Sequence, residues 1–185
     1  MNLPNRLTLL RILLIPVCCL LIAFGEYAWA AAVFAVGVLT DFLDGQIARK
    51  RNLITVFGKF ADPVADKLLV LTAMIMLVEQ GLLPAWAVCI VAARELAVDG
   101  LRLVASGKGQ VVAARMPGKI KTTLQFLCVL SALLPVPRVI CTVLTVAMAV
   151  MTVVSGALYF TSLKGVFHEE SSHSAIKEKD NGKEE

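Results

Sequence analysis

The stretch from Asp41 to Asp66 reads DFLDGQIARKRNLITVFGKFADPVAD and places four aspartates inside a strongly apolar chain. They are Asp41, Asp44, Asp62 and Asp66, at successive spacings of 3, 18 and 4 residues. Ionisable side chains in or beside a bilayer are energetically costly and mark functional sites. The stretch therefore predicts a site that collects positive charge.

The composition of the whole chain is that of a membrane protein. Of its 185 residues 58% are hydrophobic and 17% are charged, and its mean hydropathy is +0.78. Soluble domains carry about 25% charged residues, and a spanning helix needs about 20 apolar residues. We expect an all-α fold, a polytopic bundle of about six transmembrane helices with a polar cavity that faces the cytoplasm.

Short polar breaks divide the apolar sequence into six expected spans. By the positive-inside rule, the basic loops after the second and fourth spans lie in the cytoplasm, together with both termini. Residues 1–163 would form the membrane domain, and the charged residues 164–185 a disordered cytoplasmic tail. The expected spans are Leu7–Phe24, Tyr27–Leu43, Pro63–Val78, Pro84–Val104, Ile120–Leu134 and Val139–Leu163.

Several other functions find little support. The basic residues are not interleaved with aromatic ones, so nucleic acid is not an expected partner. The five cysteines show no metal-ligand or redox spacing, and we interpret them as apolar fillers. Both histidines, His168 and His173, lie in the tail. A cleaved secretion signal at the N-terminus is an alternative to a first span, but the following segments are equally apolar.

The spacing of the aspartates predicts how they meet. Asp41 and Asp44 share one face of a helix, and so do Asp62 and Asp66 on the next, with Pro63 expected in its first turn. A short link would place the two helices side by side. Four carboxylates in one cavity need compensating cations. Oxygen ligands alone favour hard ions, so we expect two divalent cations, Mg²⁺ or Mn²⁺.

Small residues and one arginine accompany the aspartates. Gly45 and Ala48 remove side-chain bulk one turn away, and Arg49 could pair with phosphate. Helix packing and membrane anchoring are the structural alternatives for these three residues. Together with a binuclear metal site they indicate phosphoryl transfer.

The complete pattern, D-x2-D-G-x2-A-R-x8-G-x3-D-x3-D, resembles the signature of the CDP-alcohol phosphatidyltransferases and matches it at every specified position. The resemblance implies that the four aspartates hold two metals and that Asp66 is the base that deprotonates the acceptor alcohol. It also implies a homodimer, and a CDP-diacylglycerol donor bound by Asn5, Thr8, Gly45, Ala48, Arg49 and Gly58.

Further motifs concern the acceptor. LPNRLTLLR at residues 3–11, AREL at 93–96, GLR at 100–102 and GKIKTTLQ at 118–125 resemble the bacterial phosphatidylglycerophosphate synthases of this family. That resemblance implies glycerol 3-phosphate as acceptor, phosphatidylglycerophosphate as product and the bacterial cytoplasmic membrane as location. Asp99 departs from the small or apolar residue expected at its position.

The charges support an anionic acceptor. We expect the acceptor phosphate to be bound by Arg94, Arg102, Lys119 and Lys121, at the cytoplasmic ends of the fourth and fifth spans. Positive-inside anchoring is the alternative role of these cations. The same chemistry with inositol phosphate or phosphatidylglycerol as acceptor stays open. A cation transporter is a different class, but it would spread its carboxylates near mid-membrane.

Overall fold

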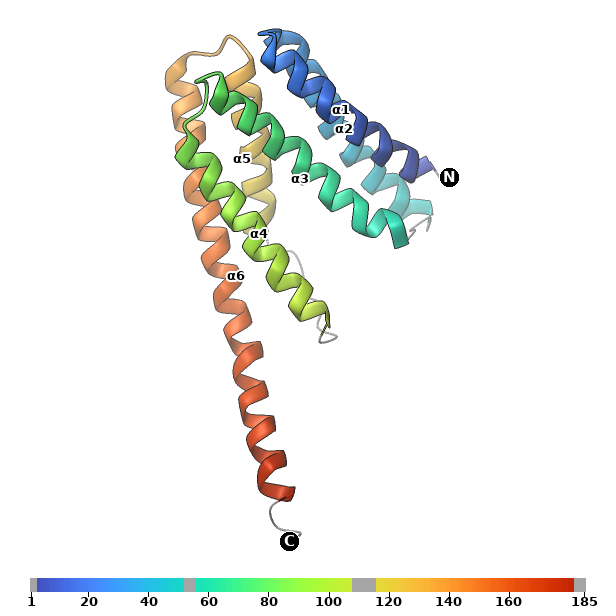
Figure 1. Cartoon of the computed structure of the whole chain (residues 1–185), viewed down its shortest axis with the longest axis vertical. Coiled ribbons are helices and arrows are strands. Elements are labelled where there is room, and N and C mark those ends of the chain that lie inside the picture. The colour runs from blue at the N-terminus through green and yellow to red at the C-terminus, as the bar shows by residue number, and fades with distance from the viewer. Residues whose placement is uncertain (1–2, 52–55, 108–115, 182–185) are drawn as a thin grey trace.

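The computed structural model describes the backbone of residues 3–51, 56–107 and 116–181, and the side chains of residues 9–40, 64–104 and 118–161. Within these ranges the chain forms six α-helices and no strand, which confirms the expected all-α class (Figure 1). The helices are α1 (Leu3–Ala23), α2 (Tyr27–Arg51), α3 (Val56–Glu79), α4 (Ala85–Gly107), α5 (Met116–Leu133) and α6 (Arg138–Asn181).

The helices form two groups of three. The helix α1 packs against α2 and α3, while α6 packs against α4 and α5 (Figure 1). The groups meet where α3 contacts α4 and α5, and where α2 contacts α5. The helix α3 therefore contacts helices of both groups.

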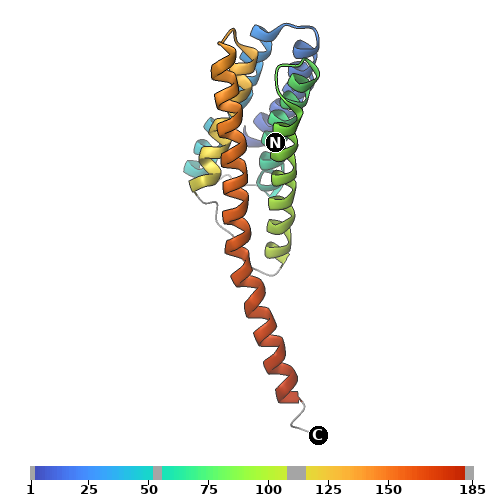
Figure 2. The ribbon, with the colours of Figure 1, turned by 90° about the vertical axis from the view of Figure 1, so that its left-hand side faces the viewer.

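Three short turns, which join α1 to α2, α3 to α4 and α5 to α6, lie at the same end of the bundle (Figure 1). Gly25 and Gly81 have φ angles of 79° and 68° in the first two turns, a conformation that favours glycine. Val136 and two flanking prolines form the third. The opposite end holds the end of α2 and the start of α3, and α6 projects beyond it as a single helix (Figure 2).

Helix boundaries differ from the expected spans at that opposite end. Helix α3 begins at Val56 rather than Pro63, so the prediction that Pro63 lies in the first turn is wrong. Apolar runs locate the expected membrane-spanning part of a helix, whereas the backbone of α3 is already helical over the seven residues 56–62 that precede Pro63. A proline inside a helix forfeits one backbone hydrogen bond, and α1 likewise contains Pro16.

The helix α6 continues to Asn181, through the segment for which the sequence predicts disorder. Lysine, glutamate and alanine in this segment favour helix. The side chains after Thr161 lie outside the described residues. The expected division of the chain after residue 163 therefore stays a prediction.

One helical segment in the described part of the chain, Arg138–Thr161, is long and apolar enough to cross a membrane. The segments Leu9–Ala23 and Tyr27–Thr40 are apolar but shorter. Charged residues interrupt the others; α4, for example, carries Arg94, Glu95, Asp99 and Arg102 within its length. The six-span arrangement therefore stays a prediction.

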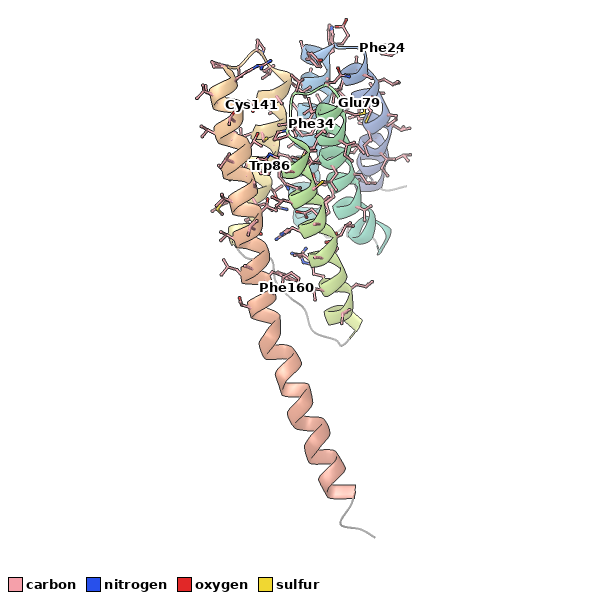
Figure 3. The ribbon with its side chains drawn as sticks, turned by 60° about the vertical axis from the view of Figure 1, so that its left-hand side comes forward. Phe24, Phe34, Glu79, Trp86, Cys141 and Phe160 are labelled. Atoms are coloured by element: carbon pink, nitrogen blue, oxygen red, sulfur yellow. The ribbon has the colours of Figure 1, made fainter. Side chains whose placement is uncertain are left out.

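Buried side chains hold α2 against α5 and α3. Phe34 is fully buried, lies among the helices in Figure 3 and packs edge-on against Phe126, with ring centroids 6.3 Å apart. One turn later, a Cβ atom on Gly37 would lie only 2.6 Å from Leu69 Cδ2. The missing side chain thus lets α2 and α3 approach closely, one turn away from Asp41 and Asp66.

Candidate active site

The backbone brings the two aspartate pairs to neighbouring helices at one end of the bundle. Asp41 and Asp44 lie in the second half of α2, and Asp62 and Asp66 in the first half of α3. These helices contact each other and run in opposite directions. The side chains of Asp41, Asp44 and Asp62 lie outside the described residues. The predicted juxtaposition of the helices is present, and the metal ligation stays a prediction.

Asp66 is described, and it is partly buried. It lines a small cavity of about 50 Å³ together with Val70, Val91 and Gln125. The Nε2 atom of Gln125 is buried without a hydrogen-bond partner among the described residues. The other residues that line the cavity include three charged side chains, so the carboxylate of Asp66 and the amide of Gln125 lie beside both apolar and charged groups. These residues are Lys67, Leu71, Glu95, Lys121 and Thr122.

Among the described side chains, no group of three or more His, Cys, Asp or Glu residues has the arrangement of a metal site. Three of the four predicted ligands lie outside that set. The donor chemistry still fits hard cations, because all four predicted ligands are carboxylates on two adjoining helices.

The predicted donor-binding residues lie at the same end of the bundle. Their side chains are outside the described residues, and their binding role stays a prediction. By backbone position, α1 carries Asn5 and Thr8, α2 carries Gly45, Ala48 and Arg49, and α3 carries Gly58.

All four predicted acceptor residues line one larger cavity of about 360 Å³. Arg94 and Arg102 come from α4, and Lys119 and Lys121 from α5. The remaining lining residues come from α3, α4 and α5: Lys67, Glu95, Gly118, Thr122 and Thr123. Five of the nine lining side chains are cationic and one is acidic, so the cavity suits an anionic ligand.

Glu95 connects three of these cations. It accepts a hydrogen bond from Lys121, pairs with Arg94 Nη1 at 3.3 Å and lies 3.9 Å from Lys67 Nζ. Its side chain is only 7% exposed, and a buried carboxylate requires such partners. Asp99 also pairs with Lys67, so two negative charges balance two of these three positive charges. The third positive charge stays available to a ligand, together with those of Arg102 and Lys119.

Helix α6 fixes the orientation of Arg94. Arg94 Nη2 donates a hydrogen bond of 2.7 Å to Ser155 Oγ. A Cβ atom on Gly156 would lie 3.3 Å from Arg94 Cγ, so the arginine stem passes over a gap in the side chains of α6. Its Nε is buried without a hydrogen-bond partner among the described residues.

Helix α6 also holds Arg102. Arg102 Nε donates to the hydroxyl of Tyr159 at 3.3 Å, and the guanidinium carbon lies 5.5 Å from the centroid of the Tyr159 ring. This distance permits a cation–π interaction. Both predicted arginines are therefore held by α6 while the cavity itself is formed by α3, α4 and α5.

Sequence reasoning did not identify Lys67, Ser155, Gly156 or Tyr159. Lys67 directly follows Asp66, the last residue of the motif, and this position could have signalled a role. The α6 residues carry no such signal, because Ser, Gly and Tyr in an apolar helix are compatible with ordinary packing.

A family model described as CDP-alcohol phosphatidyltransferase matches residues 1–156. The chain belongs to the CDP-alcohol phosphatidyltransferase family. The resemblance inferred from the aspartate signature is thereby confirmed. Members of this family are typically bacterial membrane enzymes and generally depend on divalent cations.

Several curated family members are similar to this chain over most of its length. The CDP-diacylglycerol–glycerol-3-phosphate 3-phosphatidyltransferase of Bacillus subtilis is 48% identical over 149 residues, which cover 72% of this chain and 77% of that protein. A protein of the same name from Rickettsia typhi is 38% identical, with 90% and 99% covered. A probable phosphatidylglycerophosphate synthase of Mycobacterium tuberculosis is 38% identical, with 85% and 79% covered.

Proposed function

We propose that this chain transfers the phosphatidyl group of CDP-diacylglycerol to glycerol 3-phosphate and releases CMP and phosphatidylglycerophosphate. The observation that carries the acceptor assignment is the cavity beside Asp66 in which Arg94, Arg102, Lys119 and Lys121 converge. Family membership supports the CDP-linked donor, and the names of the relatives support the same reaction.

The charge of the cavity distinguishes between acceptor classes. Choline and ethanolamine are cations, which the surplus of positive charge would repel. Serine has no net charge and does not need several cations. Glycerol 3-phosphate carries a phosphate dianion that guanidinium groups bind through charge-assisted hydrogen bonds. The buried, unpartnered Nε of Arg94 is one donor that is ready for such a ligand.

Asp66 is the proposed base. Its carboxylate takes the proton of the acceptor's terminal hydroxyl, whose oxygen then attacks the β-phosphorus of the donor. A new phosphorus–oxygen bond forms, the bond between the β-phosphorus and the oxygen of CMP breaks, and CMP leaves. The proposed donor residues are Asn5, Thr8, Gly45, Ala48, Arg49 and Gly58.

Asp41, Asp44, Asp62 and Asp66 would hold two divalent cations, Mg²⁺ or Mn²⁺. Such ions neutralise phosphoryl oxygens and stabilise a leaving phosphate. The chain's own residues supply the rest: Asp66 accepts the proton, and the basic cavity orients the acceptor so that its hydroxyl faces the donor.

The apolar surface supports a location in a membrane, and family membership supports the bacterial cytoplasmic membrane as that location. Large hydrophobic side chains are exposed on several helices, for example Leu13 (59%), Trp29 (67%) and Val139 (73%). A monomeric soluble protein rarely exposes so much apolar surface. The basic end of the bundle, with both termini and the site, would face the cytoplasm, and the enzyme would act as a homodimer.

An acceptor panel tests the function. The purified protein receives Mg²⁺ or Mn²⁺, CDP-diacylglycerol and one acceptor: glycerol 3-phosphate, glycerol, serine or inositol phosphate. We expect CMP and a labelled lipid at a high rate with glycerol 3-phosphate, and at most slow turnover of glycerol. Absence of CMP release with every acceptor would overturn the transferase assignment. Efficient turnover only with another alcohol would overturn the assignment of glycerol 3-phosphate as the acceptor.

A further inference from the structure

Lys67 lies at the junction of the two cavities. Its side chain lines both the small cavity of Asp66 and the larger basic cavity. It comes from α3, whereas the four predicted acceptor cations come from α4 and α5. Glu95, Lys121 and Thr122 also line both cavities, and among these four residues Lys67 alone comes from the helix that carries Asp66. A ligand that reaches from α4 and α5 toward Asp66 can therefore contact Lys67.

The ammonium group of Lys67 has two carboxylate neighbours. It donates a hydrogen bond to Asp99 Oδ1 and lies 3.9 Å from Glu95 Oε2. Glu95 is already paired with Arg94 and Lys121. Asp99 thus keeps Lys67 from becoming a third close partner of Glu95.

Asp99 itself lies away from the ligand space. It lines neither cavity, and its side chain is 44% exposed. Its negative charge is therefore placed behind Lys67 and does not face an anionic ligand. Asp99 and Glu95 are four residues apart and share a face of α4, so both approach Lys67 from the same side.

We propose that Lys67 is a further acceptor-binding residue, which contacts the acceptor phosphate on the side nearest Asp66, and that Asp99 is the positioning residue that holds it there. This inference rests on the proposed function, because it takes glycerol 3-phosphate as the acceptor. Glycerol 3-phosphate carries its phosphate and its attacking hydroxyl at opposite ends of three carbons. A cation between the two cavities can bind the phosphate and leave the hydroxyl free to face Asp66.

The experiment compares Lys67→Met, Lys67→Arg, Asp99→Asn and the double variant Lys67→Met/Asp99→Asn. The KM for glycerol 3-phosphate, the KM for CDP-diacylglycerol and the turnover of glycerol are measured for each. Arg138→Gln is the matched control, because it removes one cation at the opposite end of the bundle. Thermal unfolding in detergent checks that each variant is folded.

We expect Lys67→Met to raise the acceptor KM roughly tenfold or more, as loss of a charge-assisted hydrogen bond does. The donor KM and the slow turnover of glycerol, which has no phosphate, should stay within about twofold of wild type. Lys67→Arg should recover part of the loss. Asp99→Asn should raise the acceptor KM less, and it should add nothing in the Lys67→Met background.

Two results would overturn the proposal. One is an unchanged acceptor KM in folded Lys67→Met. The other is a lower acceptor KM in Asp99→Asn, which would mean that Asp99 repels the ligand and does not position Lys67. If Lys67→Met fails to fold, the sign of the Asp99→Asn effect decides. Wild-type protein that does not turn over glycerol 3-phosphate would refute the proposed function itself. This outcome differs from the two results that would overturn only the role of Lys67.

Discussion

Lys121 on α5 donates a hydrogen bond to Glu95 on α4 across the wall of the basic cavity. Both side chains are buried, at 5% and 7% exposure. In the described part of the chain, the backbones of these two helices do not pack closely against each other. The polar pair therefore links them where apolar packing does not.

Breaking the Glu95–Lys121 pair by substitution of one partner should therefore destabilise the fold. Removing one partner of a buried ion pair leaves an uncompensated charge and typically costs about 3–5 kcal/mol. We expect Glu95→Gln to lower the unfolding temperature in detergent markedly. The double variant Glu95→Gln/Lys121→Met should be more stable than Glu95→Gln alone. Independent, additive losses would show that the pair is not coupled.

The close approach of α2 to α3 at Gly37 gives a second prediction. Leu69 is fully buried, so a methyl group at Gly37 must displace it, and overpacking costs about 1–3 kcal/mol. Gly37→Ala should lower the unfolding temperature. Gly100→Ala is the matched control, because a Cβ atom on Gly100 would meet no described atom within 4 Å; helix propensity should then raise stability slightly. Equal effects of the two substitutions would contradict the packing argument.

Asp66→Asn tests the proposed base. The amide keeps the size of the side chain but cannot accept the hydroxyl proton, and loss of general base catalysis costs roughly 10²–10⁴-fold in rate. We expect CMP release to fall by at least that much, while CDP-diacylglycerol still binds to the folded protein. Wild-type turnover by the variant would remove Asp66 from the mechanism, and an unfolded variant would indicate a structural role.

Two residues of α6 that do not line the cavity should still influence acceptor binding. Ser155→Ala and Tyr159→Phe each remove a hydrogen bond to an acceptor-site arginine. A neutral partner contributes about 0.5–1.5 kcal/mol, so the acceptor KM should rise roughly two- to tenfold at unchanged donor KM. Thr161→Ala, also on α6, is the control. A parallel rise in both KM values would point to general loosening of the bundle.

The sequence predicted much of this organisation because its strongest signals are local. Apolar runs separated by glycine and proline turns located six helices, and the charge pattern selected Arg94, Arg102, Lys119 and Lys121, which do line one cavity. What brings those cations together is not local. The roles of Ser155 and Tyr159 depend on how α6 packs against α4, which no periodicity encodes.

Other differences between the sequence-based predictions and the structure also have specific physical causes. Pro63 was expected to begin a helix because proline suits a first turn, yet α3 begins at Val56 and continues through it. Lys67 was overlooked because an isolated lysine next to an aspartate also fits a membrane anchor. Asp99 was recognised as unusual from its sequence position, and its contact with Lys67 gives that departure a physical meaning.

We propose that the basic cavity recognises the phosphate of the acceptor. The direct measurement is the ratio of kcat/KM for glycerol 3-phosphate to kcat/KM for glycerol, in wild type and in Arg94→Gln/Arg102→Gln. We expect a ratio on the order of 10³ or more in wild type, as two charge-assisted contacts provide. In the variant this ratio should collapse while glycerol turnover persists; an unchanged ratio would contradict the account.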